Sequence, residues 1–240
     1  MGSIYQLGRV ALIFLVFTTT TCFTKEKKMK NYQLIYYYDA LCGWCYGFSP
    51  VMSEIYGKYH QKMDFDVVSG GLFLGDRVGA IGQVAPYIKA GAYKQVEALT
   101  GVKFGKAFLE GPLESGTMVL NSLYPATALC VVKEHYPSKT MEFSSLLQKA
   151  IYRDGMEIED WATYSNYAAQ IGLDSADFYQ KLLDPIYQQK AMQDFETWEA
   201  EGLSGFPAVV LVTKEKRILL SSGYVKYDEL EKRLSNYLNQ

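Results

Sequence analysis

The sequence predicts an α/β fold in which a mixed sheet flanked by helices carries a large, all-helical insertion. An apolar segment at residues 34–38 passes directly into a helical pattern near Cys42, and a second apolar segment lies at residues 208–212. Short apolar runs bounded by turn residues indicate buried strands. Roughly 160 residues separate the two segments, and their pattern is mostly helical.

The first strand is expected at residues 33–39, and the helix after it at residues 42–59. Residues 65–69 alternate weakly between apolar and polar side chains and predict a second strand, which Gly70 and Gly71 close. Helical patterns then follow at residues 79–91, 121–135, 141–153, 160–171, 176–183 and 185–201.

Residues at the ends of these helical patterns support the assignment. Asp160 and Asp174 are expected N-caps, while Gly155, Gly172 and Gly202 are expected helix ends. The chain then closes with strands at residues 208–212 and 218–220 and a helix at residues 227–238.

The chemistry is expected in the motif Cys42-Gly43-Trp44-Cys45. Thiols at this spacing lie one helical turn apart, close enough to bond to each other. At a helix N-terminus the first thiol faces unpaired backbone N–H groups, whose partial positive charge stabilises a thiolate. Cys42 is thus the expected nucleophile, and Cys45, shielded within the helix, the thiol that resolves a mixed disulfide. Trp44, placed between them, is expected to contact the substrate.

These residues resemble the opening of a thioredoxin fold, in which a strand leads into Cys-X-X-Cys and a proline, here Pro50, follows in the same helix. A second match is Pro207, directly before the apolar strand at residues 208–212. The long helical insertion is similar to that of DsbA-like oxidoreductases. Asp39, three residues before the first cysteine, together with Trp44, is closest to the FrnE-like subgroup. The resemblance covers roughly residues 32–238.

The resemblance implies a thiol-disulfide oxidoreductase or isomerase that acts on substrate proteins and uses no cofactor besides the Cys42–Cys45 disulfide. It implies that Pro207 follows a cis peptide bond and lies against the cysteines. Phe206 would then pair with an extended substrate, and Tyr46 would contact it. Asp39 would relay the proton that Cys45 loses. The redox partner and the preferred direction are left open, although Gly43-Trp44 supplies no cation and so predicts a less oxidising protein than a Pro-His pair would give.

Other readings of the cysteines compete with this one. The pair could be half of a zinc site, but Cys22, Cys130, His60 and His135 do not recur at ligand spacing, so no metal is expected. Cys130 lies in an alanine- and valine-rich stretch and is expected to be a buried apolar residue, with a third redox thiol as the alternative.

Two further function classes stay open. Kappa-class glutathione transferases and 2-hydroxychromene-2-carboxylate isomerases resemble this architecture, but they generally have serine in place of Cys42, which would leave Cys45 without a role. The 20 tyrosines would suit a non-enzymatic binding protein. The net charge of −2 disfavours nucleic acid.

The expected division of the chain is an extension at residues 1–28, a core in two parts at residues 29–74 and 202–240, and the insertion at residues 75–201. The apolar run at residues 10–17 is too short to span a membrane and suits an export signal, which would place the protein in the periplasm or cell envelope. Cys22 is then a candidate lipid anchor. Translation from Met29 would instead give a cytoplasmic protein.

Overall fold

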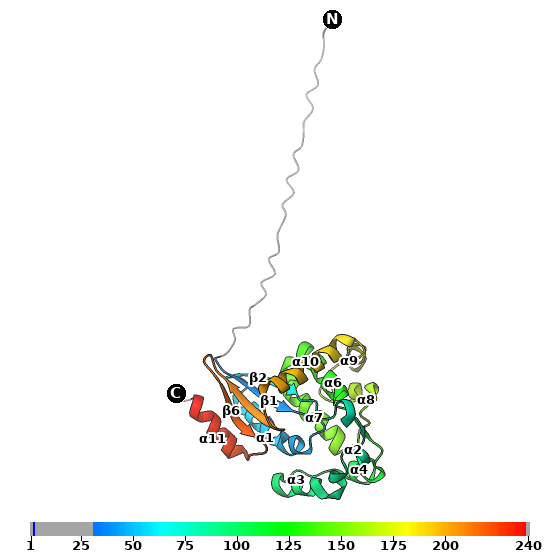
Figure 1. Cartoon of the computed structure of the whole chain (residues 1–240). Helices are drawn as coiled ribbons and strands as arrows, with labels where there is room; N and C mark the ends of the chain where they lie inside the picture. Colours follow the sequence, from blue (N-terminus) through cyan, green and yellow to red (C-terminus); the bar gives the residue numbers. More distant parts are fainter. Residues whose placement is uncertain (1, 3–30, 239–240) are drawn as a thin grey trace.

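The computed structural model describes residue 2 and residues 31–238 (Figure 1). The apolar run at residues 10–17, Cys22 and Met29 lie outside the described residues. Among the described helices, none combines the length and the apolar character that crossing a bilayer requires.

A four-stranded mixed sheet with the order β2-β1-β5-β6 forms the centre of the protein. Strand β1 (Gln33–Tyr38) runs parallel to β2 (Asp64–Ser69) and antiparallel to β5 (Ala208–Val212), and β5 pairs antiparallel with β6 (Arg217–Ser222). The register joins Tyr37 to Ala208. Strands from the two ends of the chain therefore share one sheet.

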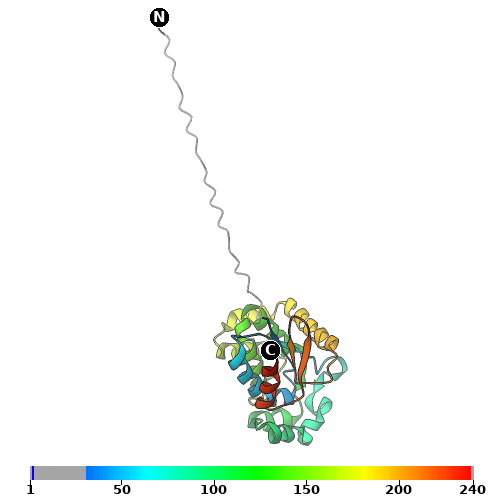
Figure 2. The ribbon, with the colours of Figure 1, turned by 90° about the vertical axis from the view of Figure 1, so that its left-hand side faces the viewer.

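Side chains of β1 alternate between two buried layers, because successive residues of a strand point to opposite faces. Leu34, Tyr36 and Tyr38 belong to the main core. That core includes helix α1 (Gly43–Tyr59), helix α7 (Thr140–Tyr152) and the C-terminal helix α11 (Tyr227–Leu238). Ile35 and Tyr37 face the other way, toward Trp198. Figure 2 shows α11, in red, nearest the viewer, with the helices of the insertion behind and around it.

The remaining helices follow β2 and precede β5 in the sequence, and they make up most of the insertion (Figure 1). They are α2 (Ile81–Val84), α3 (Tyr93–Thr100), α4 (Lys106–Glu110), α5 (Pro112–Ser115), α6 (Leu123–His135), α8 (Trp161–Gln170), α9 (Ser175–Leu182) and α10 (Pro185–Glu201). Short turns of other helix types lie at Gly75–Arg77, Ile88–Ala92 and Pro137–Lys139.

The insertion is helical, as predicted, but it also contains a small two-stranded sheet, so it is not all-helical. Strand β3 (Gly79–Ala80) pairs antiparallel with β4 (Val119–Leu120). The single helix expected at residues 79–91 is thus wrong. Pro86 explains part of the difference: it disfavours a helical conformation at Ala85, whose φ of −140° and ψ of 48° end α2.

The predicted helix ends are confirmed where capping residues are present. The side chains of Asp160 and Asp174 accept hydrogen bonds from the first turns of α8 and α9. Gly202 ends α10 with a φ of 68°, a left-handed conformation that glycine adopts without steric cost. Gly155 and Gly172 have positive φ as well, shortly after α7 and α8.

Candidate active site

The two cysteines of the motif lie at the N-terminus of α1, and their environments differ. Cys42 is the N-cap residue, with an extended backbone conformation, and its Sγ accepts the Cys45 N–H at 3.4 Å. Cys42 is 7% exposed and Cys45 is 0% exposed. Burial raises the pKa of Cys45 well above its usual value, and the nearby Cys42 sulfur raises it further. Both thiols are free.

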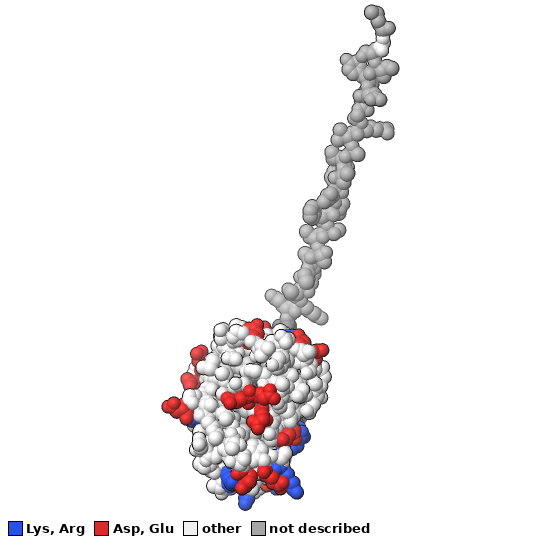
Figure 3. All heavy atoms as spheres, turned by 90° about the vertical axis from the view of Figure 1, so that its right-hand side faces the viewer, with Lys and Arg blue, Asp and Glu red and all other residues white. Residues whose placement is uncertain are grey.

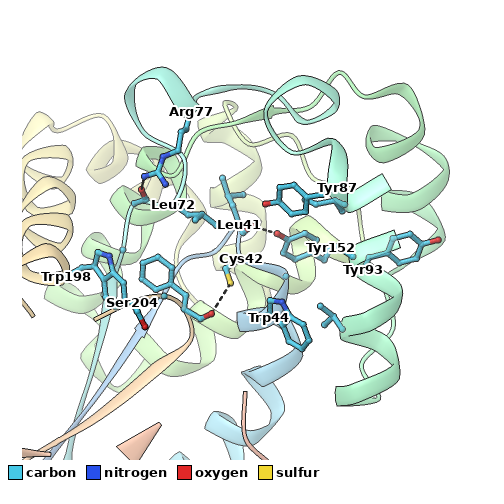
Figure 4. A pocket seen from close by; sticks show the side chains of 18 of the residues that line it. Leu41, Cys42, Trp44, Leu72, Arg77, Tyr87, Tyr93, Tyr152, Trp198 and Ser204 are labelled. Atoms are coloured by element: carbon cyan, nitrogen blue, oxygen red, sulfur yellow. Dashed lines mark hydrogen bonds between the residues drawn. The ribbon is translucent and has the colours of Figure 1, made fainter. Parts of the chain in front are cut away.

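The loop before β5 brings a second part of the chain to Cys42. The Phe206–Pro207 peptide bond is cis, as predicted. The Cys42 thiol lies 3.9 Å from the Phe206 carbonyl oxygen, which is the acceptor (Figure 4). Phe206 and the cysteines are far apart in sequence, so the pairing of β1 with β5 is what brings them together.

Asp39 holds the turn that leads from β1 into α1. Its carboxylate is buried, and its two oxygens accept the N–H groups of Leu41 and Leu72, each at 2.8 Å. Burial raises the pKa of Asp39, although these hydrogen bonds oppose the shift. Besides burial and the Cys42 sulfur, the Asp39 charge is a smaller cause of the raised pKa of Cys45, while the Asp39 backbone opposes the shift.

A cavity of about 420 Å³ opens beside Cys42. Trp44 and Phe206, two of the predicted substrate-contacting residues, form part of its wall. The cavity lies between the insertion and the loops that follow β1 and β2 and precede β5, and its walls are mostly aromatic and apolar (Figure 4). No sequence pattern pointed to the arginine and the further aromatic side chains of this wall, which are Arg77, Tyr87, Tyr93, Phe104, Tyr152 and Trp198.

Tyr46, the third predicted substrate-contacting residue, does not line this cavity. Its side chain is buried, its hydroxyl donates to the Lys103 carbonyl at 2.9 Å, and its ring packs against Phe104 and Tyr152. Tyr46 thus lies in the aromatic layer that supports the cavity wall.

The third described cysteine lies elsewhere. Cys130 is buried in α6 and does not line the cavity, and burial raises its pKa to about 12. This placement agrees with the interpretation of Cys130 as an apolar packing residue. Within residues 31–238, no group of three or more His, Cys, Asp or Glu side chains is arranged to hold a metal ion.

The structure combines three features: two thiols at a helix N-terminus, a cis proline close to them, and a helical insertion in the sheet fold. Together they define a thiol-disulfide oxidoreductase of the DsbA type. A family model described as DSBA-like thioredoxin domain matches residues 33–235, and the chain belongs to this family. A search of curated proteins gave no match.

Solved structures agree with this fold. A putative protein disulfide isomerase from Nitrosomonas europaea is 23% identical, with a TM-score of 0.77 over 88% of this chain and 99% of its own. The cytosolic disulfide reductase DsbM from Pseudomonas aeruginosa is 23% identical, with a TM-score of 0.71 over 86% and 98%. A probable DsbA oxidoreductase from Streptomyces coelicolor is 17% identical, with a TM-score of 0.64 over 87% and 91%.

Proposed function

We propose that the protein exchanges disulfides with substrate proteins through Cys42 and Cys45. The observation that carries this proposal is the contrast between the two thiols. Cys42 lines the cavity at a helix N-terminus, whereas Cys45 is fully buried one turn further along the helix. A substrate sulfur can therefore reach Cys42 first, and Cys45 can reach only the sulfur of Cys42.

In the reducing direction the Cys42 thiolate attacks one sulfur of a substrate disulfide. A Cys42–substrate bond forms, the substrate S–S bond breaks, and the second substrate sulfur leaves as a thiolate. Cys45 then loses its proton and attacks Cys42 Sγ, which releases the first substrate sulfur and leaves the Cys42–Cys45 disulfide. Two electrons pass to the substrate, and a dithiol partner of unknown identity restores the pair. The oxidising direction is the reverse.

Asp39 is the proposed acceptor of the Cys45 proton. Burial keeps Cys45 protonated, so its attack requires a nearby base. The raised pKa of Asp39 makes its carboxylate a stronger base than an exposed one. Its hydrogen bonds to Leu41 and Leu72 also fix it in place, which limits the reorganisation that proton transfer needs.

The cavity walls suggest how the substrate is held. An extended segment would pair with the backbone at Phe206, as in strand addition, while its side chains contact Trp44. Figure 3 shows one face of the described protein as largely uncharged, with a group of acidic side chains near its middle and without a continuous basic area. That face does not suit the phosphate backbone of a nucleic acid.

A low-molecular-weight thiol is a second candidate substrate. The volume of about 420 Å³ lies within the range of small-ligand sites, roughly 300–1,000 Å³. The Pseudomonas aeruginosa reductase DsbM has been solved with GSH. The cavity beside Cys42 could accept glutathione as the leaving or attacking thiol of the same exchange.

Insulin reduction by dithiothreitol tests the proposal. The wild type, Cys42→Ser and Cys45→Ala are compared with Cys130→Ser, which removes a buried thiol outside the cavity. Only the two motif variants should lose catalysis. A glutathione-conjugation assay run in parallel separates the transferase alternative, because a transferase would conjugate without Cys45. Full insulin activity in Cys42→Ser would overturn the proposal.

A further inference from the structure

Tyr152 connects the insertion directly to the backbone beside the reactive cysteine. It is the last residue of α7, it is buried, and its ring packs against Phe104 and Phe108 at centroid distances of 5.2 Å. Its hydroxyl donates a hydrogen bond to the Leu41 carbonyl oxygen (Figure 4). That oxygen belongs to the peptide group that joins Leu41 to Cys42.

The same peptide group is also held by Asp39, in the turn that follows β1. Its N–H, that of Cys42, donates to the Asp39 carbonyl at 3.1 Å. The Leu41 N–H, one peptide earlier, is bound by the Asp39 carboxylate. Asp39 therefore holds the turn through hydrogen bonds to residues of the turn itself. Tyr152 adds a hydrogen bond from the insertion.

The orientation of this peptide group bears on where the Cys42 sulfur lies. Cys42 is the N-cap of α1, with φ −91° and ψ 112°, and in this conformation its Sγ accepts the Cys45 N–H. A rotation of the peptide plane changes φ of Cys42 and moves the sulfur relative to both the helix N-terminus and the Phe206 carbonyl. Displacements of about 1 Å in a reacting group can cost about a hundredfold in rate.

The Tyr152 hydroxyl keeps its proton, and so can donate this hydrogen bond, over a wide pH range. Burial raises its pKa well above the usual tyrosine value, with the Cys42 charge as a further cause, so it stays protonated as pH rises. It lines the cavity as well, which agrees with a place next to the reacting sulfur.

We propose that Tyr152 is a positioning residue for disulfide exchange: its hydroxyl fixes the Leu41–Cys42 peptide group, and thereby the Cys42 sulfur, from the helical insertion. The proposal rests on the assignment of Cys42 as the attacking thiol. It gives the insertion a part in the reaction besides covering the cavity, because one of its helices sets the geometry of the thioredoxin-like motif.

The test compares Tyr152→Phe with Tyr164→Phe. Tyr164 is a matched control, because it is a fully buried tyrosine of the insertion whose hydroxyl also donates to a backbone carbonyl, that of Ile158 at 2.8 Å, and it does not line the cavity. Each change removes one oxygen atom and one hydrogen bond. The measurements are the rate of attack of reduced protein on bis(hydroxyethyl) disulfide across a pH series, thermal unfolding, and hydrogen exchange of the Cys42 amide.

Tyr152→Phe should slow the attack about two- to tenfold, the range that corresponds to the loss of one hydrogen bond, while Tyr164→Phe leaves the rate unchanged. Both should lower the melting temperature to a similar extent. The Cys42 amide should exchange faster in Tyr152→Phe alone, which a role confined to stability would not produce.

Two results would overturn the inference: equal rates of attack in Tyr152→Phe and wild type, or an equal slowing in both tyrosine variants. A Cys42→Ser protein that reacts as fast as wild type would instead refute the assignment of Cys42 as the nucleophile. The two failures are therefore distinguishable.

Discussion

Gly70→Ala is a sharp test of how the loop at Phe206 is held against the cysteines. A Cβ atom built on Gly70 would lie 1.9 Å from Cζ and 2.0 Å from Cε1 of the Phe206 ring. Real Cβ atoms do not approach so closely, so the ring has to move. The ring also packs on Trp198, with 3.9 Å between the centroids, which restricts its movement on that side.

The backbone of Gly70 accepts an alanine, because Gly70 is not among the residues with positive φ. The cost is therefore one of overpacking, about 1–3 kcal/mol in the free energy of unfolding. In a protein of this size each kcal/mol corresponds to about 2–4 °C in melting temperature. Because Trp198 confines the ring, we expect part of the displacement to pass to the Phe206 backbone, whose carbonyl lies beside Cys42, and disulfide exchange should slow about tenfold.

Gly205→Ala is the control, since its Cβ would meet no atom within 4 Å and it lies next to Phe206. Chemical denaturation and insulin reduction are measured for both variants. Gly205→Ala should stay within about 0.5 kcal/mol of wild type. The reasoning is refuted if Gly70→Ala is as stable and as active as wild type, or if both alanines have the same effect.

Three further predictions follow from the site. Cys45→Ala should accumulate mixed disulfides between Cys42 and its partner proteins, seen on non-reducing gels, whereas equal trapping by Cys42→Ala would reverse the roles. Because burial raises the pKa of Asp39 above 3.8, the folded protein holds this proton more tightly than the unfolded chain does. The stability of wild type relative to Asp39→Asn should therefore fall as pH rises from about 3.8 toward the raised pKa, and a constant difference in urea unfolding would contradict this. Cys130, with a pKa of about 12, should resist iodoacetamide at pH ~8 until denaturant is added, and labelling in the folded protein would show that the site is accessible.

The sequence predicted the parts of the fold that local patterns determine. A strand that runs into Cys42, and Pro207 directly before an apolar strand, each have a signature within a few residues, and both assignments agree with the structure. The helix at Tyr93–Thr100 was missed, although Gly101, which ends it with a φ of 80°, is a signal that could have indicated it.

Contacts made by the insertion could not be predicted in the same way. The strands β3 and β4 have two residues each, too few to show the alternation of apolar and polar side chains that indicates a strand. Tyr152 lies in a helical pattern in which nothing distinguishes it from a packing residue, and its bond to Leu41 depends on how α7 lies against α1. Likewise, Tyr46 lies next to the motif in sequence, but its ring packs against Phe104 and Tyr152, which line the cavity, and does not line the cavity itself.

The antiparallel pairing of β1 with β5 has a consequence for synthesis of the chain. Cys42 and Cys45 leave the ribosome well before Phe206 and Pro207 do, and β1 cannot form its ladder with β5 until most of the chain has been made. During that interval both thiols are carried by a nascent chain that lacks one wall of its cavity. Pairing strands so distant in sequence also closes a long loop, which slows folding unless the intervening helices have already compacted. The insertion should therefore fold before β1 pairs with β5, and the rate at which it folds should limit how soon the protein becomes redox-active.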